Sequence, residues 1–131
     1  MHDANQADLE AISPTICLVD DDPMIRELFS RVIQRSGCQV LVAFDAADAE
    51  SVLAGGQVDI LLSDLNMPDA TDGEQLLKSV KTTYPNLPVC MMSADWPPAA
   101  REKMLEQGAS ACLAKPFSTD DFTQLIASLE W

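Results

Sequence analysis

The 131-residue sequence predicts one doubly wound α/β domain, in which helices cover both faces of a parallel sheet. Five short apolar segments alternate along the chain with five segments of helical periodicity. The apolar segments show little polar alternation, as expected for parallel strands that are buried on both faces. Because right-handed crossovers connect such units, the strands should form one sheet between two layers of helices.

Composition limits the partners of this domain. The net charge is −13 and the pI is about 4.1, a balance that repels nucleic-acid phosphates and anionic lipids. No stretch approaches the ~18 apolar residues of a membrane span. The N-terminus has neither a basic region nor an apolar core of a signal peptide. We therefore expect a cytoplasmic domain that binds neither nucleic acid nor membrane by itself.

Residues 1–14 are polar, acidic and aperiodic, and we expect a flexible acidic N-terminal tail ahead of a folded domain at 15–131. The four cysteines show no metal-like spacing and most lie in apolar runs. They are predicted to be free buried thiols rather than disulfides or zinc ligands. These residues are Cys17, Cys38, Cys90 and Cys112.

The first strand is predicted at Ile16–Val19 and leads directly into three aspartates and Pro23. Proline suits the first position of a helix, with Asp22 as its N-cap. The helix that follows should end at Gly37. Its inward stripe is predicted to consist of Ile25, Leu28, Phe29, Val32 and Ile33.

The next elements are a strand over Gln39–Phe44 and an alanine-rich helix over Ala46–Leu53. Val58–Leu62 is too short for an independent helix and rich in β-formers, which predicts a third, buried strand. It runs into Ser63-Asp64, and Pro68 follows shortly after. A helix is then expected from residue 72 to about residue 83, with Leu76, Leu77 and Val80 on its inward side.

The last two units follow the same order. A fourth strand is predicted at Leu87–Met92, and a helix should open at Trp96-Pro97-Pro98 and run to about residue 107. The fifth strand is predicted at Ala111–Ala114, just before Lys115-Pro116. The last helix should span Asp120–Leu129, with residue 118 or 119 as its N-cap.

Four of the predicted strands lead into side chains that can react or bind a ligand. The first leads into Asp20 and Asp21, the third into Asp64, the fourth into Ser93 and the fifth into Lys115. The carboxyl ends of parallel strands lie on one edge of the sheet, where ligands bind in such folds. These five residues are therefore expected to converge on one crevice.

The charges in this crevice indicate a metal. Three close carboxylates repel each other by ~1 kcal/mol per pair even in water, and Lys115 offsets only part of that repulsion. Oxygen ligands without His or Cys favour Mg²⁺ over Ca²⁺ or Zn²⁺. A Mg²⁺ site with a lysine and a hydroxyl is also suited to phosphoryl transfer, with one carboxylate as the nucleophile.

Each residue also has a structural explanation when it is taken alone. Asp22 is a helix cap rather than a ligand, and Asp20 or Asp21 could be a cap too. Ser93 could satisfy a loop N–H, and Lys115 could be a surface charge. Their joint occurrence at strand ends favours the functional interpretation. The remaining loop acids are expected to be solvated, namely Asp59, Asp69, Asp72 and Asp95.

The chain resembles the receiver domain of two-component response regulators, including chemotaxis regulators, over about residues 15–130. The resemblance implies the flavodoxin-like (βα)5 fold with sheet order 2-1-3-4-5. It rests on LVDDDP at residues 18–23, DILLSDLNMP at 59–68, DG at 72–73, MMSA at 91–94 and GASACLAKPF at 108–117.

The resemblance also implies residue roles. Asp64 would be the phosphoacceptor, and Asp20 and Asp21 the acidic pair. Mg²⁺ would be bound at Asp20, Asp21 and Asp64, with the backbone carbonyl of Asn66. A histidine kinase or histidine phosphotransfer protein would donate the phosphoryl group, which the domain would lose slowly to water. Such a domain catalyses only its own phosphorylation and dephosphorylation and is not otherwise an enzyme.

In the same family, Ser93 would be the switch hydroxyl and Lys115 would pair with a phosphoryl oxygen across a cis Lys115-Pro116 bond. Output would be read on the fourth helix, fifth strand and fifth helix. The candidate contacts there are Trp96, Met104, Phe122 and Trp131.

Two features depart from the family pattern. Cys112 stands where the family usually has an aromatic residue, while Trp96 opens the preceding helix as either an output element or a packing residue. The loop over residues 67–73 is one residue longer than the commonest spacing.

Two rival functions come from other classes. An aspartyl-phosphate phosphatase would need a second acid–base carboxylate and a substrate cap, and the chain has no cap. A pseudo-receiver would bind a partner without cycling phosphate. Because no output domain follows Trp131, we expect a single-domain regulator or a receiver excised from a longer protein, as a monomer or weak homodimer.

Overall fold

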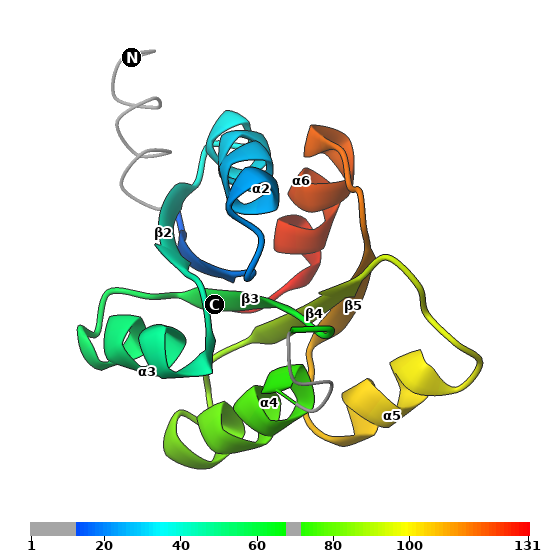
Figure 1. The fold of residues 1–131 in the computed structure, drawn as a ribbon. Helices are drawn as coiled ribbons and strands as arrows, with labels where there is room; N and C mark the ends of the chain where they lie inside the picture. Colours follow the sequence, from blue (N-terminus) through cyan, green and yellow to red (C-terminus); the bar gives the residue numbers. More distant parts are fainter. Residues whose placement is uncertain (1–12, 68–71) are drawn as a thin grey trace.

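The computed structural model describes residues 13–67 and 72–131, and these form a parallel five-stranded sheet between two helical layers (Figure 1). The strand order is β2-β1-β3-β4-β5, which confirms the predicted fold. The strands are β1 Thr15–Val19, β2 Gln39–Ala43, β3 Ile60–Asp64, β4 Val89–Ser93 and β5 Ala111–Ala114. The helices are α2 Pro23–Arg35, α3 Ala46–Ala54, α4 Asp72–Thr83, α5 Ala100–Glu106 and α6 Thr119–Ser128.

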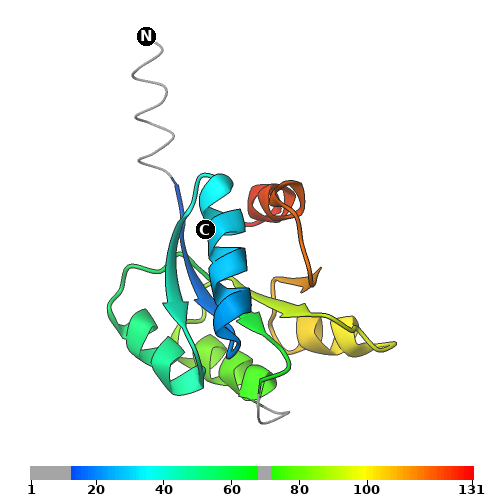
Figure 2. The ribbon, with the colours of Figure 1, turned by 45° about the horizontal axis from the view of Figure 1, so that its top comes forward.

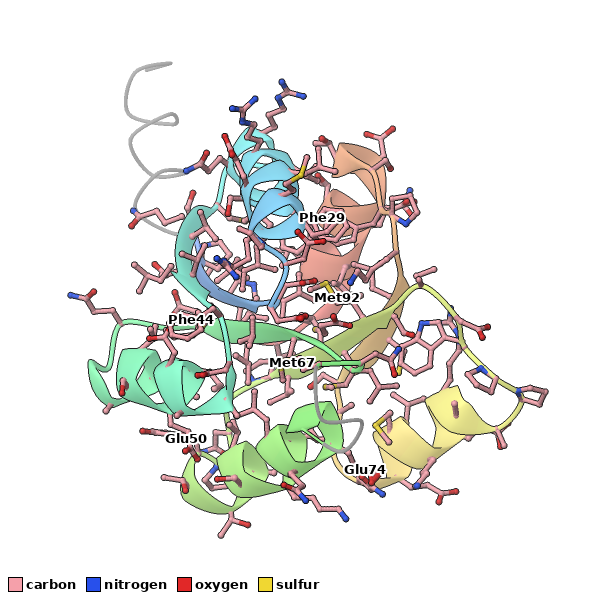
Figure 3. The ribbon with its side chains drawn as sticks, in the orientation of Figure 1. Phe29, Phe44, Glu50, Met67, Glu74 and Met92 are labelled. Atoms are coloured by element: carbon pink, nitrogen blue, oxygen red, sulfur yellow. The ribbon has the colours of Figure 1, made fainter. Side chains whose placement is uncertain are left out.

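Helices α2 and α6 lie side by side on one face of the sheet, and α3, α4 and α5 cover the other (Figures 1 and 2). Under α2 and α6, the ring of Phe117 lies 4.3 Å from that of Phe29 and 5.8 Å from that of Phe122. Phe29 and Met92 lie on this side of the sheet (Figure 3). Burying each such ring contributes about 1.5–3 kcal/mol.

The second core lies beneath α3, α4 and α5 and includes Leu76, Leu77 and Val80, as the sequence predicted. Polar contacts link the helices above it. Ser79 of α4 donates a hydrogen bond to Glu50 of α3 at 2.7 Å, and Lys103 of α5 pairs with Glu74 of α4 at 3.1 Å (Figure 3).

Strands β3 and β4 are buried along their whole length, but the edge strand β2 is not. The prediction of burial on both faces was therefore wrong for the two edge strands. In β2, Val42 is 48% exposed and the adjoining Phe44 is 55% exposed (Figure 3), and no residue of β5 is fully buried. An edge strand has a neighbour on one side only, and the helices pack over the middle of the sheet. Leu28 of the predicted inward stripe of α2 is also 51% exposed, so that prediction was wrong as well.

Several predicted boundaries were shifted. Strands β3 and β4 begin two residues later than expected, so that Asp64 and Ser93 are their last residues. Helix α5 begins at Ala100 rather than Trp96, because Ala99 has a left-handed φ of 69° and the Ala100 N–H donates to the Pro97 carbonyl. The prolines thus form a turn ahead of the helix instead of its first turn.

The helix caps follow the sequence. The Asp22 side chain accepts hydrogen bonds from Met24 and Ile25 at the start of α2. Ser118 caps α6 in a reciprocal capping box with Asp121. No helix in the described part of the chain is long and apolar enough to cross a bilayer.

At the N-terminus, the tail predicted at residues 1–14 lies outside the described residues as far as residue 12. Pro14 belongs to the folded part, since it is buried and its carbonyl accepts the Gln39 N–H at 3.0 Å. The described cysteines are free thiols as predicted, but Cys112 is only partly buried. The lengthened loop at 67–73 also falls largely outside the described residues.

Candidate functional site

The carboxyl edge of the sheet brings the predicted site residues together. Carboxylate oxygens of Asp20, Asp21 and Asp64 all lie within 4.8 Å of one another. The Lys115 ammonium lies 3.0 Å from an Asp20 oxygen and 3.3 Å from an Asp64 oxygen. The four residues come from three strand ends, and the parallel order of the sheet is what collects them.

Asp20 follows β1 and is 1% exposed. Its backbone N–H donates to the Ala43 carbonyl at 3.2 Å, and its side chain accepts the Asp22 N–H at 2.9 Å. Arg26 of α2 donates to the Asp20 carbonyl at 2.7 Å. The sequence interpretation missed Arg26, because nothing in the helical pattern of α2 shows that this side chain reaches back to the strand end.

Asp64 ends β3 and is 4% exposed. The Asn66 N–H donates to one carboxylate oxygen at 3.1 Å, and Lys115 contacts the other. Burial raises the pKa of Asp64, and the Asp20 charge adds to this, while the Asn66 N–H and the Lys115 charge oppose it. The carboxyl is therefore kept less acidic than an ordinary aspartate.

Gly73 allows the first turn of α4 to pass close to this strand end. A Cβ at this position would lie 2.6 Å from the Asp64 carbonyl oxygen and 2.5 Å from the Leu65 carbonyl oxygen. Only a residue without a side chain fits there. The glycine of the DG pair thus fixes the distance between α4 and the site.

Ser93 ends β4 and is fully buried. Its hydroxyl accepts from the Asn66 side-chain amide at 2.9 Å and from the Asp95 N–H at 3.2 Å. It donates to the Asp95 carbonyl at 2.7 Å. The side-chain role of Asn66 was not predicted, since the sequence suggested only a ligand carbonyl.

Lys115 follows β5, and its side chain is 14% exposed. Burial alone would lower the pKa of Lys115, but the hydrogen bond to Asp20 and the charges of Asp64 and Asp20 outweigh it and raise that pKa. The ammonium is therefore held charged against the carboxylates. The Lys115-Pro116 bond is cis, as the resemblance implied.

The donor set fits a hard divalent cation. All candidate ligands among the described residues of the cluster are carboxylate oxygens, and neither His nor Cys takes part. Asp21 is exposed, which leaves one side of the cluster open to water ligands. With three carboxylates and one ammonium, a divalent ion would complete the charge balance.

The acids that were expected to be solvated in loops differ in their surroundings. Asp59 is not merely solvated, because it accepts the Thr15 N–H at 2.8 Å. Asp95 is exposed as expected. Asp69 lies outside the described residues, and nothing is described of the Asp72 side chain.

The output contacts need correction. Met104 is 3% exposed and Phe122 is fully buried, so neither can form a contact surface. Both point into a core because each lies on the inward stripe of its helix. Trp131 is 48% exposed, but it lines a cavity with Val58 and Tyr84 at the amino ends of β3 and β4 rather than lying beside β5. Trp96 remains, half-buried beside β5.

The fold and this cluster define a flavodoxin-like α/β domain with an acidic pocket closed by a lysine. The response regulator receiver domain family matches residues 16–127, and the chain belongs to that family. It is therefore the receiver domain of a two-component response regulator or of a related signalling protein.

Relatives and solved structures agree with this assignment. The chain is 41% identical over 111 residues to the DNA-binding transcriptional regulator NtrC of Proteus hauseri, covering 85% of this chain and 23% of that protein. It is 36% identical over 112 residues to the sensor histidine kinase RcsC of Salmonella typhi, covering 86% of this chain and 12% of that protein. The chain thus spans less than a quarter of the length of these curated relatives.

Among solved structures, the chemotaxis protein CheY4 of Vibrio cholerae superimposes with a TM-score of 0.82 at 26% identity, covering 90% of this chain and 99% of that one. The receiver domain of the Francisella response regulator 1452 gives a TM-score of 0.78 at 29% identity, covering 88% and 94%. Both similarities cover nearly the whole described fold.

Proposed function

We propose that this receiver domain accepts a phosphoryl group on Asp64 from a histidine kinase or a histidine phosphotransfer protein, in a Mg²⁺-dependent reaction. The observation that supports it is the contact of the Lys115 ammonium with both Asp20 and Asp64 inside a cluster of three carboxylates. A structural ion pair would need one carboxylate, not three.

In this reaction an Asp64 carboxylate oxygen attacks phosphorus, a P–O bond forms, and the P–N bond to the donor histidine breaks. The electron pair of that bond returns to the imidazole. The Asn66 N–H holds one carboxylate oxygen in place, which fixes the direction of the other. Lys115 and Ser93 lie where an ammonium and a hydroxyl can contact phosphoryl oxygens.

Asp20, Asp21 and Asp64, with the Asn66 carbonyl, would hold Mg²⁺, which when bound neutralises charge on the transferring group. Phosphorylation then adds about −1.5 to −2 charge at Asp64 and changes the contacts that the domain makes with proteins. The domain acts in the cytoplasm as a monomer or weak homodimer, without nucleic-acid or membrane contacts of its own. It catalyses only its own phosphorylation and dephosphorylation.

Intact-protein mass spectrometry tests the proposal. The wild type and Asp64→Asn are incubated with acetyl phosphate, with Mg²⁺ or with EDTA. One alkali-labile phosphoryl group should appear on the wild type with Mg²⁺ and be absent from the other three samples. Mg²⁺ binding without any adduct, from acetyl phosphate or from a phosphorylated histidine phosphotransfer protein, would instead identify a binding module that does not cycle phosphate.

A further inference from the structure

The segment between β4 and α5 connects the candidate site to the outer edge of the sheet. Ser93 begins this segment in the site, and Trp96 lies three residues later. The Trp96 indole N–H donates to the Leu113 carbonyl of β5 at 3.1 Å. Strand β5 is an edge strand, so this side chain ties the segment to the border of the sheet.

Arg101 forms the second half of the same attachment. Its guanidinium lies 5.2 Å from the centre of the Trp96 ring, within the range of a cation–π contact. Arg101 also donates to the Cys112 carbonyl at 3.0 Å. Trp96 and Arg101 therefore bind two consecutive carbonyls of β5 and pack on each other.

The hydroxyl of Ser93 holds the other end of the segment. A serine hydroxyl has a single hydrogen to donate, and here it goes to the Asp95 carbonyl at 2.7 Å. Asp95 is joined to Trp96 by a peptide bond, so the direction of that carbonyl fixes the peptide that leads into the indole. Ser93 can donate to a phosphoryl oxygen on Asp64 only after it releases the Asp95 carbonyl.

The backbone of this segment depends on such contacts. Ala99 has a φ of 69°, a left-handed conformation that is unfavourable for a residue with a Cβ. Residues 94, 95, 97 and 98 are exposed and gain little from packing. The segment is therefore held by polar contacts at Ser93 and at β5, together with the packing of the half-buried Trp96 against the core beneath α3, α4 and α5.

We propose that Trp96 is the latch of the phosphorylation switch: its indole holds the Ser93–Ala99 segment on β5 in the unphosphorylated chain and leaves β5 when Ser93 turns to the phosphoryl group. This inference rests on the proposed phosphorylation of Asp64. The charge change at Asp64 is thereby converted into exposure of an indole and release of the Leu113 carbonyl of β5.

Tryptophan fluorescence tests the latch, because the chain has two tryptophans. In Trp131→Phe, Trp96 is the single reporter, and acetyl phosphate with Mg²⁺ should shift its emission to the red and increase its quenching by acrylamide. The matched control is Trp96→Phe, in which the half-exposed Trp131 reports from a cavity with Val58 and Tyr84 at the amino ends of β3 and β4, away from the site. Its emission and quenching should stay unchanged.

A second measurement separates a latch from a packing residue. Trp96→Phe keeps an aromatic ring but loses the N–H donor, and one neutral hydrogen bond corresponds to a factor of about five in an equilibrium. Phosphorylation by limiting acetyl phosphate should therefore become faster by up to about five-fold. Amide exchange should also become faster at residues 94–96 and 99, which have backbone N–H groups, and not in β3.

The outcomes are distinguishable when mass spectrometry accompanies each spectrum. A phosphoryl adduct on Trp131→Phe without any change in Trp96 quenching would overturn the latch and leave the proposed function intact. Absence of an adduct under all conditions would overturn the proposed function and the latch with it. Slower phosphorylation of Trp96→Phe would show that the indole supports the reactive state rather than restraining it.

Discussion

Replacing Asp64 with asparagine should stabilise the metal-free domain. The change keeps the size of the side chain and an oxygen that can accept the Asn66 N–H, but it removes one charge from the cluster. Three terms decide the result: the repulsion from Asp20 and Asp21, the attraction to Lys115, and the cost of burying the charge.

The Coulomb terms nearly cancel. At 4.8 Å or less, repulsion from the buried Asp20 is about 3 kcal/mol or more at an effective dielectric constant of ~20. Asp21 is exposed, so its share is screened to about 1 kcal/mol. Attraction to Lys115 at 3.3 Å is about 5 kcal/mol on the same scale.

The cost of burying the Asp64 charge then decides whether the substitution stabilises or destabilises the domain. Asp64 is 4% exposed, and removing a carboxylate from water costs several kcal/mol. The raised pKa of Asp64 agrees, since burial outweighs the Lys115 and Asn66 contributions that would lower it. We therefore expect Asp64→Asn to raise the free energy of unfolding in EDTA by about 1–3 kcal/mol.

Urea unfolding followed by circular dichroism at pH 7 in EDTA measures this difference. Addition of Mg²⁺ should then reverse the order of stability, because the mutant has lost the site and only the wild type is stabilised by binding. A Mg²⁺ concentration of ten times the Kd adds about 1.4 kcal/mol to the free energy of unfolding of the wild type, and higher concentrations add more. If Asp64→Asn were instead less stable than the wild type in EDTA by more than about 1 kcal/mol, the Lys115 attraction would dominate and the reasoning from burial would be wrong.

Three further predictions concern the lysine, the glycine and the thiols. Lys115→Ala should lower the free energy of unfolding in EDTA by about 3 kcal/mol, because it leaves buried carboxylate charge uncompensated. Urea titrations should show a smaller loss when the same substitution is made in Asp64→Asn. Gly73→Ala should lower the free energy of unfolding by about 1–3 kcal/mol in the same assay, since its Cβ would meet the Asp64 and Leu65 carbonyls. Gly55→Ala should cost less, because its Cβ would lie 3.3 Å from the Val52 carbonyl oxygen. Burial raises the pKa of Cys17 and Cys90 from 9.0 to about 12, so at pH 8 DTNB should modify the partly buried Cys112 first and these two thiols only on unfolding. Because the folded pKa values are the higher ones, the stability contributed by these protonated thiols is complete below pH 9 and should be lost as pH rises towards 12 in alkaline urea titrations.

The positions of the site residues could be predicted because they depend on topology alone. Alternation of strands and helices places the end of every strand at one edge, so Asp20, Asp64 and Lys115 had to meet wherever their strands began. The shifts of two residues at β3 and β4 did not change this result. Burial periodicity likewise predicted the inner sides of α2 and α4, including Phe29 and Leu76, although Leu28 of the predicted α2 stripe is exposed.

Contacts of long side chains could not be predicted in this way. Arg26 reaches the Asp20 carbonyl and Arg101 reaches the Cys112 carbonyl, but the sequence marks neither arginine as different from a solvated one. The start of α5 was also missed, because two prolines suit a first helical turn as well as the turn that precedes it. The exposure of β2 and the burial of Met104 were not predicted either, because both depend on how several elements pack together.

The separation of core and site explains how an unfavourable cluster is tolerated. The rings of Phe29, Phe117 and Phe122 and the leucines of α4 lie in the two cores, while the charged cluster occupies the edge. Most of the apolar contacts that stabilise the fold therefore lie away from Ser93, and in the segment after it the half-buried Trp96 packs against a core. That segment is held by a few hydrogen bonds of about 1 kcal/mol each and by one partly buried indole. Their combined contribution is small beside the effect of placing a doubly charged group a few ångströms away. A switch at this edge can change its contacts without unfolding the domain.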